Sequence, residues 1–400
     1  MKITFVCRGM REGGGIQRVI DEITRKLLNN HKDVNLTIVS DNFPDYMVNE
    51  KRINKVKIPS SAGLTKAIKA PRYLHVLLAQ PIFLVLATLY IMFNRKQLGT
   101  VYNHGAGQCL AQDIVIFHSC HHAWVKTKRK NGKKAGKISA YLSPFDWFIM
   151  ACEKINTIKN RKQQIVAVSD YTKEQLSEYL KVSESSVINN GVDVDRFRKN
   201  ADSELRPEYN LTAEDKVILF VANEWKRKGL ENVFATVANL KNEIKNIKLL
   251  IAGRNLNSAV HNFKEKYNLS DEVIFLGETN NIEDLYAISD VLCVPSEEDA
   301  FGLVFAEAMS SEVPTIVTDK CGMAKYIQHG VNGFLISTDD VRKNLFINLK
   351  DILSSNLNNR LIGLNGRNTV VNNLSWEEIT SQYVKVALEK NTVPLVSHVK

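Results

Sequence analysis

The chain of 400 residues is 44% hydrophobic and 24% charged, and its formal net charge at pH 7 is +10. These proportions are those of a soluble globular protein and exclude a disordered chain, and the length suits two domains that each bury a core. The excess of positive charge favours anionic partners, among them sugar nucleotides, phospholipid surfaces and nucleic acid.

The cysteines and the amino terminus indicate a cytosolic protein. The six cysteines are scattered along the chain, several of them within expected strands, which is typical of reduced thiols in a core. Residues 1–6 enter a strand at once, so we expect no signal peptide.

The chain opens with a strand, a glycine-rich turn and an amphipathic helix, predicted at residues 2–7, 8–15 and 16–28. This order is typical of the ligand-binding start of a Rossmann-like fold. Gly13 and Gly15 occupy the first two glycine positions of the dinucleotide fingerprint, but Arg18 occupies the third. We therefore expect a turn that binds phosphate and sugar, and no dinucleotide.

The most apolar segment of the chain is residues 74–93. His75, Gln80 and Pro81 interrupt it, so its continuous apolar run is 82–93, which is too short to span a bilayer. Basic residues flank the segment on both sides. Two interpretations stay open: a core helix under the first sheet, or a helix that lies partly in a membrane interface.

Four possible metal ligands follow the predicted strand 113–117, namely His118, Cys120, His121 and His122. Consecutive residues at the end of a strand point apart, and no second cluster of ligands is near in the sequence. The sequence therefore argues against a metal site. A packed or surface histidine is the simpler alternative for each position.

Residues 126–137 carry seven cations in twelve positions without apolar periodicity, which predicts a mobile surface loop. Such a run is usually only solvated, and contact with an anionic acceptor or lipid headgroups is the alternative. Nucleic acid is not an expected partner, because interleaved aromatic residues and a nucleic-acid-binding fold are not visible.

The other elements alternate strand and helix, which predicts parallel sheets. The first half has further strands at residues 35–40, 55–58, 100–104 and 164–169, and helices at 141–156 and 170–180. Residues 198–215 are predicted as a linker. The second half has strands at 217–222, 248–252, 273–277, 291–295, 314–318 and 333–336, and helices at 281–289 and 375–390.

The strand at 291–295 leads into an acidic loop, Gly302 and a helix of residues 301–309. This order leaves a helix amino terminus, with free N–H groups and a positive dipole, open to a ligand anion. Asp299 stands at the mouth of the helix and Glu307 lies eight residues further on. Carboxylates there can accept hydrogen bonds from hydroxyl groups. The simpler alternative is an acidic cap on an ordinary α/β unit.

Several of these segments resemble one family. Asp299 and Glu307 with Phe301-Gly302 resemble the E-x7-E region of family 4 retaining glycosyltransferases, which have the GT-B architecture of two Rossmann-like domains. Gly14, Gly15 and Arg18 are similar to the family's GG-x-x-R start. The segment 187–197 is similar to its NGVD segment. The chain departs from the family's pattern at two positions. Asp299 stands where a Glu is usual, and Glu298 could compensate for the shorter side chain. Asn223 stands where an Arg is common.

The resemblance implies a role for each matching residue. Asp299 would hold the donor sugar and Glu307 the ribose, while His118 would lie near the sugar. The backbone of Phe301, Gly302 and Leu303 would offer amides to the donor. Lys228 with Arg227, or else Lys226, would neutralise the diphosphate, and Gly14 and Gly15 would let the backbone approach the ligands.

We therefore expect an α/β protein of the GT-B class, with two Rossmann-like domains facing a central cleft. The expected ranges are an acceptor-binding domain at 1–197, a nucleotide-sugar-binding domain at 198–375, and a helix and tail at 376–400 that pack toward the first domain. The expected activity is retaining, metal-independent transfer of a sugar, with lipopolysaccharide or surface-polysaccharide biosynthesis as the implied setting. No convincing nucleophile is visible, in keeping with front-face displacement.

The expected partners are a nucleotide-sugar donor, first of all a UDP-sugar, and a saccharide or lipid-linked acceptor. No cofactor is expected, and the location is the cytoplasm, with peripheral contact to the anionic inner face of the membrane. Two alternatives stay open: a sugar-nucleotide 2-epimerase on the same architecture, and a non-catalytic partner subunit of a glycosyltransferase.

Overall fold

Apolar runs of four to six residues form the centre of the fold, because each is buried on both faces of a parallel sheet. The computed structural model describes residues 1–10, 14–59, 72–134, 143–158, 163–199, 203–279, 281–354 and 358–392. The chain divides into unit 1, Met1–Asn190 with Trp376–Lys400, and unit 2, Gly191–Ser375. The first boundary therefore falls after Asn190, whereas the sequence places it after residue 197.

Unit 1 contains a parallel sheet in the order β3-β2-β1-β4-β5-β6-β7. Its strands are β1 (Lys2–Val6), β2 (Asn35–Ser40), β3 (Ile53–Lys57), β4 (Thr100–His104), β5 (Ile114–Phe117), β6 (Gln164–Ala167) and β7 (Ser186–Val187). The order reverses direction between β1 and β4. Ligands of such sheets bind outside the carboxyl ends of the strands at this reversal.

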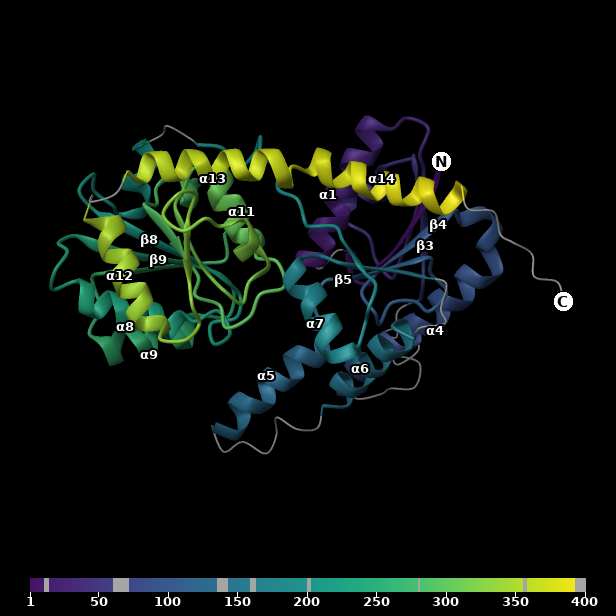
Figure 1. Cartoon of the computed structure of the whole chain (residues 1–400), viewed down its shortest axis with the longest axis horizontal. Coiled ribbons are helices and arrows are strands. Elements are labelled where there is room, and N and C mark those ends of the chain that lie inside the picture. The colour runs from purple at the N-terminus through teal and green to yellow at the C-terminus, as the bar shows by residue number, and fades with distance from the viewer. Residues whose placement is uncertain are drawn as a thin grey trace. The chain divides into compact units, whose positions relative to one another are not determined.

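Helices cover both faces of this sheet (Figure 1). On one face α1 packs against α14, and on the other α6 contacts both α4 and α5. The helices of unit 1 are α1 (Gly15–Asn30), α2 (Asp45–Asn49), α4 (Arg72–Leu98), α5 (His121–Lys134), α6 (Pro144–Asn156), α7 (Asp170–Leu180) and α14 (Trp376–Thr392). The helix α14 thus follows unit 2 in the sequence but belongs to unit 1.

The helix α4 is longer than the apolar run that predicts it, since it continues through Gln80 and Pro81. Residues Leu78–Leu98 have a mean hydropathy of 1.4 and would suffice, by length and composition alone, to cross a membrane. The helix is thus longer than the continuous apolar run 82–93, on which the expectation of a segment too short to span a bilayer was based. One side of the helix packs on the sheet through Phe83, Ala87 and Ile91, as expected for a core helix.

Unit 2 has a parallel sheet in the order β10-β9-β8-β11-β12-β13. Its strands are β8 (Lys216–Val221), β9 (Ile247–Ala252), β10 (Val273–Gly277), β11 (Val291–Cys293), β12 (Thr315–Thr318) and β13 (Phe334–Ile336). This order reverses between β8 and β11, just as the first sheet reverses between β1 and β4. The predicted α/β class is confirmed, with a Rossmann-like sheet in each unit.

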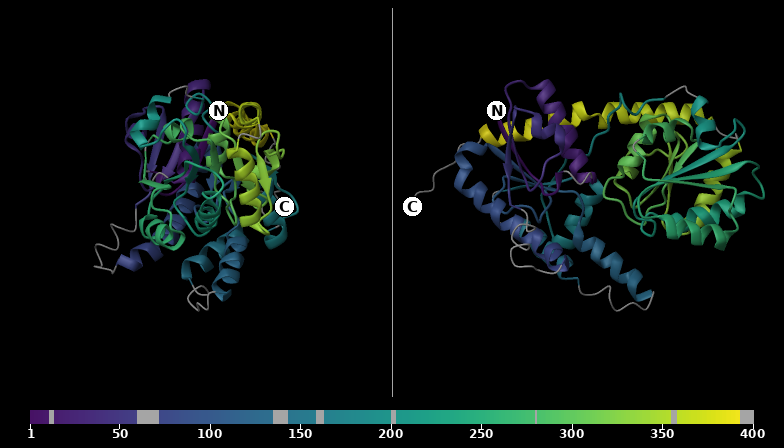
Figure 2. Two further views of the ribbon diagram at one scale, coloured as in Figure 1. Left: turned by 90° about the vertical axis from the view of Figure 1, so that its left-hand side faces the viewer. Right: turned by 180° about the vertical axis from the view of Figure 1, so that it is seen from behind.

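Figures 1 and 2 show helices on both faces of the second sheet as well. On one face α8 contacts α9 and α12, and on the other α11 contacts α13. The helices of unit 2 are η3 (Ser203–Tyr209), α8 (Leu230–Leu240), α9 (Asn257–Tyr267), α10 (Ile282–Ala287), α11 (Leu303–Ser310), η4 (Gly322–Tyr326), α12 (Val341–Leu353) and α13 (Asn359–Leu374).

Two segments differ from their predicted character. Most of the basic segment 126–137 is helical, because α5 runs to Lys134. Lys and Arg are good helix formers, and Ala123 and Val125 anchor the start of the helix in the core, so apolar periodicity is not needed further along. The expected linker 198–215 contains η3, whose Arg206 donates to the carbonyl of Ile288 in the same unit.

Candidate functional site

In unit 2, the predicted donor-binding residues follow β8 and β11, the two strands where the sheet order reverses. The loop after β8 carries Arg227 and Lys228, and the loop after β11 carries Asp299 and Gly302. Parallel neighbours end at the same edge of a sheet, so the two loops meet at the place where Rossmann-like sheets bind ligands.

Hydrogen bonds tie these two loops together. The backbone N–H of Glu297 donates to the carbonyl of Arg227 over 2.8 Å, and Nη1 of Arg227 donates to the carbonyl of Glu298 over 2.6 Å. Gly229 has a φ of +73° and lies so close to Pro295 that a Cβ would come within 2.3 Å of the Pro295 carbonyl oxygen. The loop geometry therefore depends on this glycine.

Lys228 and Asp299 form an ion pair between Nζ and Oδ2. Their side chains are only 14% and 16% exposed, which strengthens the attraction relative to a surface pair. Arg227 is held by Glu224 as well as by the carbonyl of Glu298, so its guanidinium is fixed on the acidic loop. The ammonium of Lys226 instead lies 5.0 Å from the centre of the Trp225 ring.

Asn223, which stands where the resemblance suggests an Arg, has a structural role. Its side-chain oxygen accepts a hydrogen bond of 2.8 Å from the backbone N–H of Arg254, in the loop after β9. The side chain of Arg254 is 44% exposed and pairs with Glu278 at 3.4 Å. Sequence reasoning did not identify this cation at the carboxyl edge of the sheet, because nothing in the sequence links it to Asn223.

The amino terminus of α11 begins at Gly302, whose φ is +92°. A Cβ on this residue would lie 2.7 Å from the ring of Phe305 and 2.8 Å from Sγ of Cys321. The adjacent Phe301 is buried, and its carbonyl accepts from the N–H of Met323. The first amides of a helix, here those of Leu303 and Val304, have no intrahelical acceptor and can bind an anion, whereas the N–H of Phe305 donates to the carbonyl of Gly302.

Glu307 lies on α11 and is 3% exposed. Its Oε2 accepts a hydrogen bond of 2.9 Å from the hydroxyl of Tyr286, a residue of α10 with no exposed surface. A buried carboxylate requires such partners, because desolvation would otherwise favour its neutral form. Tyr286 is a second residue that sequence reasoning missed, and its position in an ordinary amphipathic helix gives no signal.

In unit 1, Gly14 immediately precedes α1 and Gly15 is its first residue, which places both after β1 at the carboxyl edge of the sheet. A Cβ on Gly15 would meet no atom within 4 Å, so packing does not require a glycine there. Gly13 lies outside the described residues. A hydrogen bond connects the turn before α1 with the end of β2. Nε of Arg8, in the turn, donates to the carboxylate of Asp41, which follows β2, over 3.2 Å.

His118 follows β5, and its Nε2 lies 3.1 Å from Nδ1 of His104, the last residue of the neighbouring strand β4. Burial lowers the pKa of His118 to about 4. Burial and the proximity of His118 also lower the pKa of His104 well below its usual range. Both rings are therefore neutral at pH 7. Sequence reasoning missed His104, although a histidine at the end of a neighbouring parallel strand is a visible signal.

The other histidines of this cluster diverge from His118. Nδ1 of His122 donates to Glu153 over 2.6 Å, and Nε2 of His121 lies 3.1 Å from Asp146. The Glu153 carboxylate also accepts the backbone N–H groups of both histidines and so caps the amino terminus of α5. Among the described residues, no group of three His, Cys, Asp or Glu side chains is placed to hold a metal ion.

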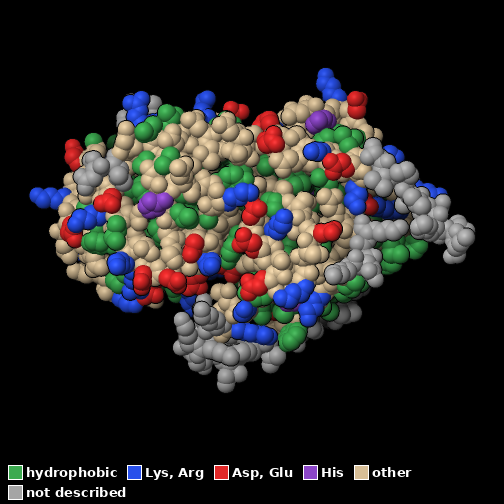
Figure 3. Space-filling view, viewed as in Figure 1, with side chains coloured by type: hydrophobic (Ala, Val, Ile, Leu, Met, Phe, Trp, Pro, Cys, Tyr) green, Lys and Arg blue, Asp and Glu red, His purple; other side chains and the backbone are tan. Residues whose placement is uncertain are grey.

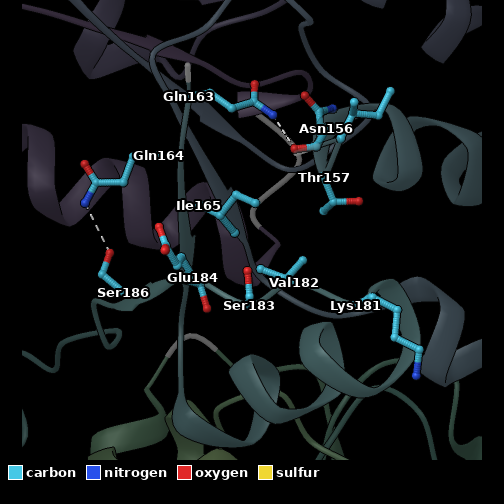
Figure 4. Close-up of a pocket in the computed structure, with 12 residues that line it drawn as sticks. Asn156, Thr157, Gln163, Gln164, Ile165, Lys181, Val182, Ser183, Glu184 and Ser186 are labelled. Carbon is cyan, nitrogen blue, oxygen red and sulfur yellow. Dashed lines mark hydrogen bonds between the residues drawn. The ribbon is translucent and has the colours of Figure 1, made fainter. Parts of the chain in front are cut away.

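A polar cavity of about 560 Å³ lies in unit 1, at the amino-terminal end of β6 and beside β7, and Figure 4 shows the residues that line it. Gln164 donates to Ser186 over 3.3 Å across one side of it, and Lys181 and Glu184 also line it. It lies at the edge of the sheet opposite to His104 and His118, so it does not belong to the predicted site.

Two family models match the chain, one over each half. Residues 13–196 match the model described as "Glycosyltransferase Family 4". Residues 201–369 match the model described as "Glycosyl transferases group 1". The predicted donor-binding residues of unit 2 all lie within the second match.

Two curated relatives and one solved structure show the extent of the similarity. N-acetyl-alpha-D-glucosaminyl L-malate synthase of Bacillus anthracis is 28% identical over 55% of this chain, which spans 58% of that relative's length. UDP-Gal:alpha-D-GlcNAc-diphosphoundecaprenol alpha-1,3-galactosyltransferase of Escherichia coli is 24% identical, and the match covers 94% of this chain and 95% of the relative. WaaG, a glycosyltransferase involved in lipopolysaccharide biosynthesis, superposes with a TM-score of 0.76 at 15% identity, over 96% of this chain and 99% of WaaG.

Proposed function

The chain belongs to the glycosyl transferases of group 1 with the GT-B fold, and from this membership we propose a more specific activity. The protein is a retaining, metal-independent glycosyltransferase that moves a sugar from a nucleotide-diphosphate donor to a saccharide or lipid-linked acceptor. Homologues act in polysaccharide and lipopolysaccharide biosynthesis, and we assign this chain to the same kind of pathway in the cytoplasm.

The observation that carries this proposal is the ion pair of Lys228 with Asp299 at the amino terminus of α11. When the bond from the sugar to the diphosphate breaks, the leaving group gains negative charge. A preorganised ammonium group and the free amides of α11 stabilise that charge without a metal ion. Glu307, held by Tyr286, accepts hydrogen bonds from the ribose hydroxyls. Asp299, oriented by Lys228, holds the sugar.

A UDP-sugar is our first choice of donor. The Escherichia coli relative that matches nearly the whole chain carries UDP-Gal, a diphosphoundecaprenol-linked acceptor and an alpha linkage in its name. Thermal-shift measurements with UDP, GDP and ADP, each alone and linked to glucose, galactose or N-acetylglucosamine, would identify the donor. Binding of none of these compounds would contradict the proposal.

Replacing Lys228 with Ala tests the role of the ion pair. Turnover should fall more than donor affinity, because the leaving-group charge is largest in the transition state. Lys226→Ala is the matched control, since that ammonium lies over Trp225 and should be nearly neutral. Equal losses in turnover and affinity for Lys228→Ala would show simple ground-state binding instead.

Two further assays separate the proposed reaction from its alternatives. Incubation with labelled donor and no acceptor should leave the sugar configuration unchanged, whereas a 2-epimerase would alter it. Transfer to an added acceptor should persist in excess chelator. Activity that disappears with chelator and returns with one divalent cation would refute the metal-independent mechanism. Absence of transfer with every donor and acceptor would favour a non-catalytic subunit.

We also propose peripheral contact of unit 1 with an anionic membrane. The side of α4 that faces away from the sheet exposes Val85, Leu89, Met92 and Phe93, of which Phe93 is 84% exposed. The helix α5 carries Lys126, Lys128 and Arg129, and Figure 3 shows several Lys and Arg side chains in the lower part of the view. Apolar side chains and clustered cations are the two signals that together give reversible attachment to an anionic bilayer.

Sedimentation with vesicles of phosphatidylglycerol and phosphatidylcholine tests this contact. Binding should fade with salt, because each cation near the surface contributes ~1 kcal/mol. Met92→Ser with Phe93→Ser should release the protein without affecting donor binding. Val48→Ser, at an exposed apolar residue of α2, is the control. A wild-type protein that stays in solution at low salt would contradict the proposal.

A further inference from the structure

Two adjacent parallel strands of unit 1 each end in a histidine. His104 is the last residue of β4, and His118 follows β5. The strands pair in register, with His104 opposite Ile116. Nδ1 of His104 and Nε2 of His118 lie 3.1 Å apart, with ring centres separated by 5.4 Å and ring planes inclined by 26°. A separation of 3.1 Å between two ring nitrogens requires one hydrogen between them.

Aromatic rings enclose His104. The ring of Phe5 meets it edge-on at 5.3 Å, and the ring of Tyr383 from α14 lies parallel to it at 6.0 Å. His104 has no exposed surface. The hydroxyl of Tyr102, on the same strand, donates to the carbonyl of Tyr383. These packing contacts restrict the orientation of the His104 ring.

The second nitrogen of His104 determines which histidine donates. Its Nε2 is buried and has no hydrogen-bond partner in the described part of the chain. A buried N–H without an acceptor is rarer and costlier than a lone pair without a donor. The favoured arrangement therefore leaves Nε2 of His104 unprotonated and places the proton on Nδ1, from where it is donated to Nε2 of His118.

This arrangement also defines the state of His118. A neutral imidazole that accepts at Nε2 carries its own proton at Nδ1. His118 is only partly buried, and no described residue is hydrogen-bonded to its Nδ1. We propose that His104 is a positioning residue that fixes His118 in the Nδ1–H tautomer, so that His118 donates a hydrogen bond to an oxygen of the donor sugar. This inference rests on the proposed function and on the resemblance, which implies that His118 lies near that sugar.

The two rings therefore have different roles. His118 contacts the ligand as a hydrogen-bond donor and does not accept a proton from it, because its accepting nitrogen is already used. His104 contacts no ligand and acts only through His118. Without His104, an isolated imidazole mostly carries its proton on Nε2, and the nitrogen turned toward the ligand would become an acceptor.

Long-range ¹H–¹⁵N spectra of the full chain with labelled histidine test the tautomer directly. The chain has nine histidines, and His118→Gln assigns the signals of interest. In the wild-type protein His118 should be protonated at Nδ1. His104→Phe, which keeps a ring but removes the donor, should shift His118 to the Nε2–H form. His104→Asn, whose amide can replace the Nδ1–H group, should restore the Nδ1–H form.

A wild-type His118 protonated at Nε2 would overturn the inference, and so would an unchanged tautomer in a folded His104→Phe variant. The wild-type spectrum decides the matter even if that variant does not fold. Because the spectra need no substrate, this outcome is independent of the proposed activity.

Kinetics with UDP-galactose as the probe test the contact with the sugar. In His104→Phe, kcat/KM should fall roughly tenfold, the equivalent of one net hydrogen bond. The affinity for UDP should not change, because UDP lacks the sugar, and His104→Asn should recover most of the loss. Equal losses for UDP and UDP-galactose would overturn the inference. Absence of transfer by the wild-type protein would instead contradict the proposed function.

Discussion

At the scale of single residues, the two carboxylates of the candidate site in unit 2 are each held by a neighbouring side chain. Lys228 holds Asp299, and Tyr286 holds Glu307. Each pairing fixes the side chain whose role the resemblance suggests. An Asp at position 299 has a shorter reach than a Glu, and its ion pair with Lys228 places the carboxylate next to the cation proposed to bind the diphosphate.

The first prediction concerns Glu307. We expect Glu307→Gln to weaken binding of the nucleoside diphosphate by roughly 10- to 100-fold, since a hydrogen bond to a charged group contributes ~1.5–3 kcal/mol. Tyr286→Phe removes only the supporting hydroxyl and should cost less. Isothermal titration of both variants would measure the difference. An unchanged affinity in folded Glu307→Gln would refute the ribose assignment.

The second prediction concerns acid. Burial lowers the pKa of His118 from 6.5 to about 4 and lowers that of His104 as well. Between pH 4 and pH 6.5 the two histidines bind more protons in the unfolded chain than in the folded one. The free energy of unfolding therefore falls as the pH drops from 6.5 to 4, and above pH 6.5 it does not depend on this pair. The neighbouring Tyr102 and Tyr383 remain neutral, because burial raises their pKa values.

For His118 alone the loss is on the order of a few kcal/mol, since each unit of pKa corresponds to roughly 1.4 kcal/mol. Urea unfolding of unit 1 at a series of pH values would measure it. His118→Gln is the comparison, because it removes the titrating group and should flatten the dependence. The same slope in both proteins would show that other groups cause the acid sensitivity.

At the scale of elements, the start of α11 depends on one backbone conformation. Gly302 has a φ of +92°, and a Cβ there would collide with Phe305 and Cys321. We expect Gly302→Ala to lower the free energy of unfolding by ~1–3 kcal/mol, the cost of a strained backbone conformation. Nucleotide affinity should fall as well, because the amides of α11 would move.

Gly15→Ala is the matched control for this third prediction. Gly15 too lies at the start of a helix at a predicted ligand-binding turn, but a Cβ there would meet no atom within 4 Å. It should leave stability unchanged or raise it slightly, because Ala favours the helix. Thermal unfolding of both variants would decide, and equal effects would contradict the argument from packing.

The basic segment shows how an element can depend on a distant residue. The start of α5 is capped by Glu153 of α6, and Ala123 and Val125 bury its first turn. These contacts stabilise a helix whose later residues lack any apolar pattern. A sequence window over 126–137 contains none of them, and this is why the segment was predicted as a loop.

At the scale of the whole molecule, one structural unit is built from two separate stretches of the sequence. The last helix, α14, follows unit 2 in the sequence but packs against α1 of unit 1. Its Trp376, Ile379 and Tyr383 are buried. Unit 1 is therefore complete only after the end of the chain has been added.

The fourth prediction follows from this connection. Tyr383→Ala should lower the free energy of unfolding of unit 1 by ~3–5 kcal/mol, the usual cost of truncating a buried aromatic residue. Leu388→Ala, on the same helix but 50% exposed, should have little effect. Hydrogen exchange of the β1 and β4 amides would report the loss. Protection that falls only in unit 2 would contradict the assignment of α14.

The sequence by itself determined nearly all of the strands, several of the helices and one half of the candidate site. Most of the parallel strands contain an apolar run, as β5 and β8 do, and a strand was predicted at the place of every strand except the two-residue β7. The spacing of Asp299, Gly302 and Glu307 is local, since all three lie on one loop and the helix after it. A local pattern of this kind depends on only a few neighbouring residues and can be recognised without a fold.

Only the tertiary structure decided which side chains meet. The contacts of His104 with His118, of Tyr286 with Glu307 and of Asn223 with Arg254 join residues from different elements. Such contacts depend on the order and register of the strands, because a shift of one residue turns a side chain to the opposite face of a sheet. The sheet order and register are properties of the whole unit, and no single stretch of its sequence contains them.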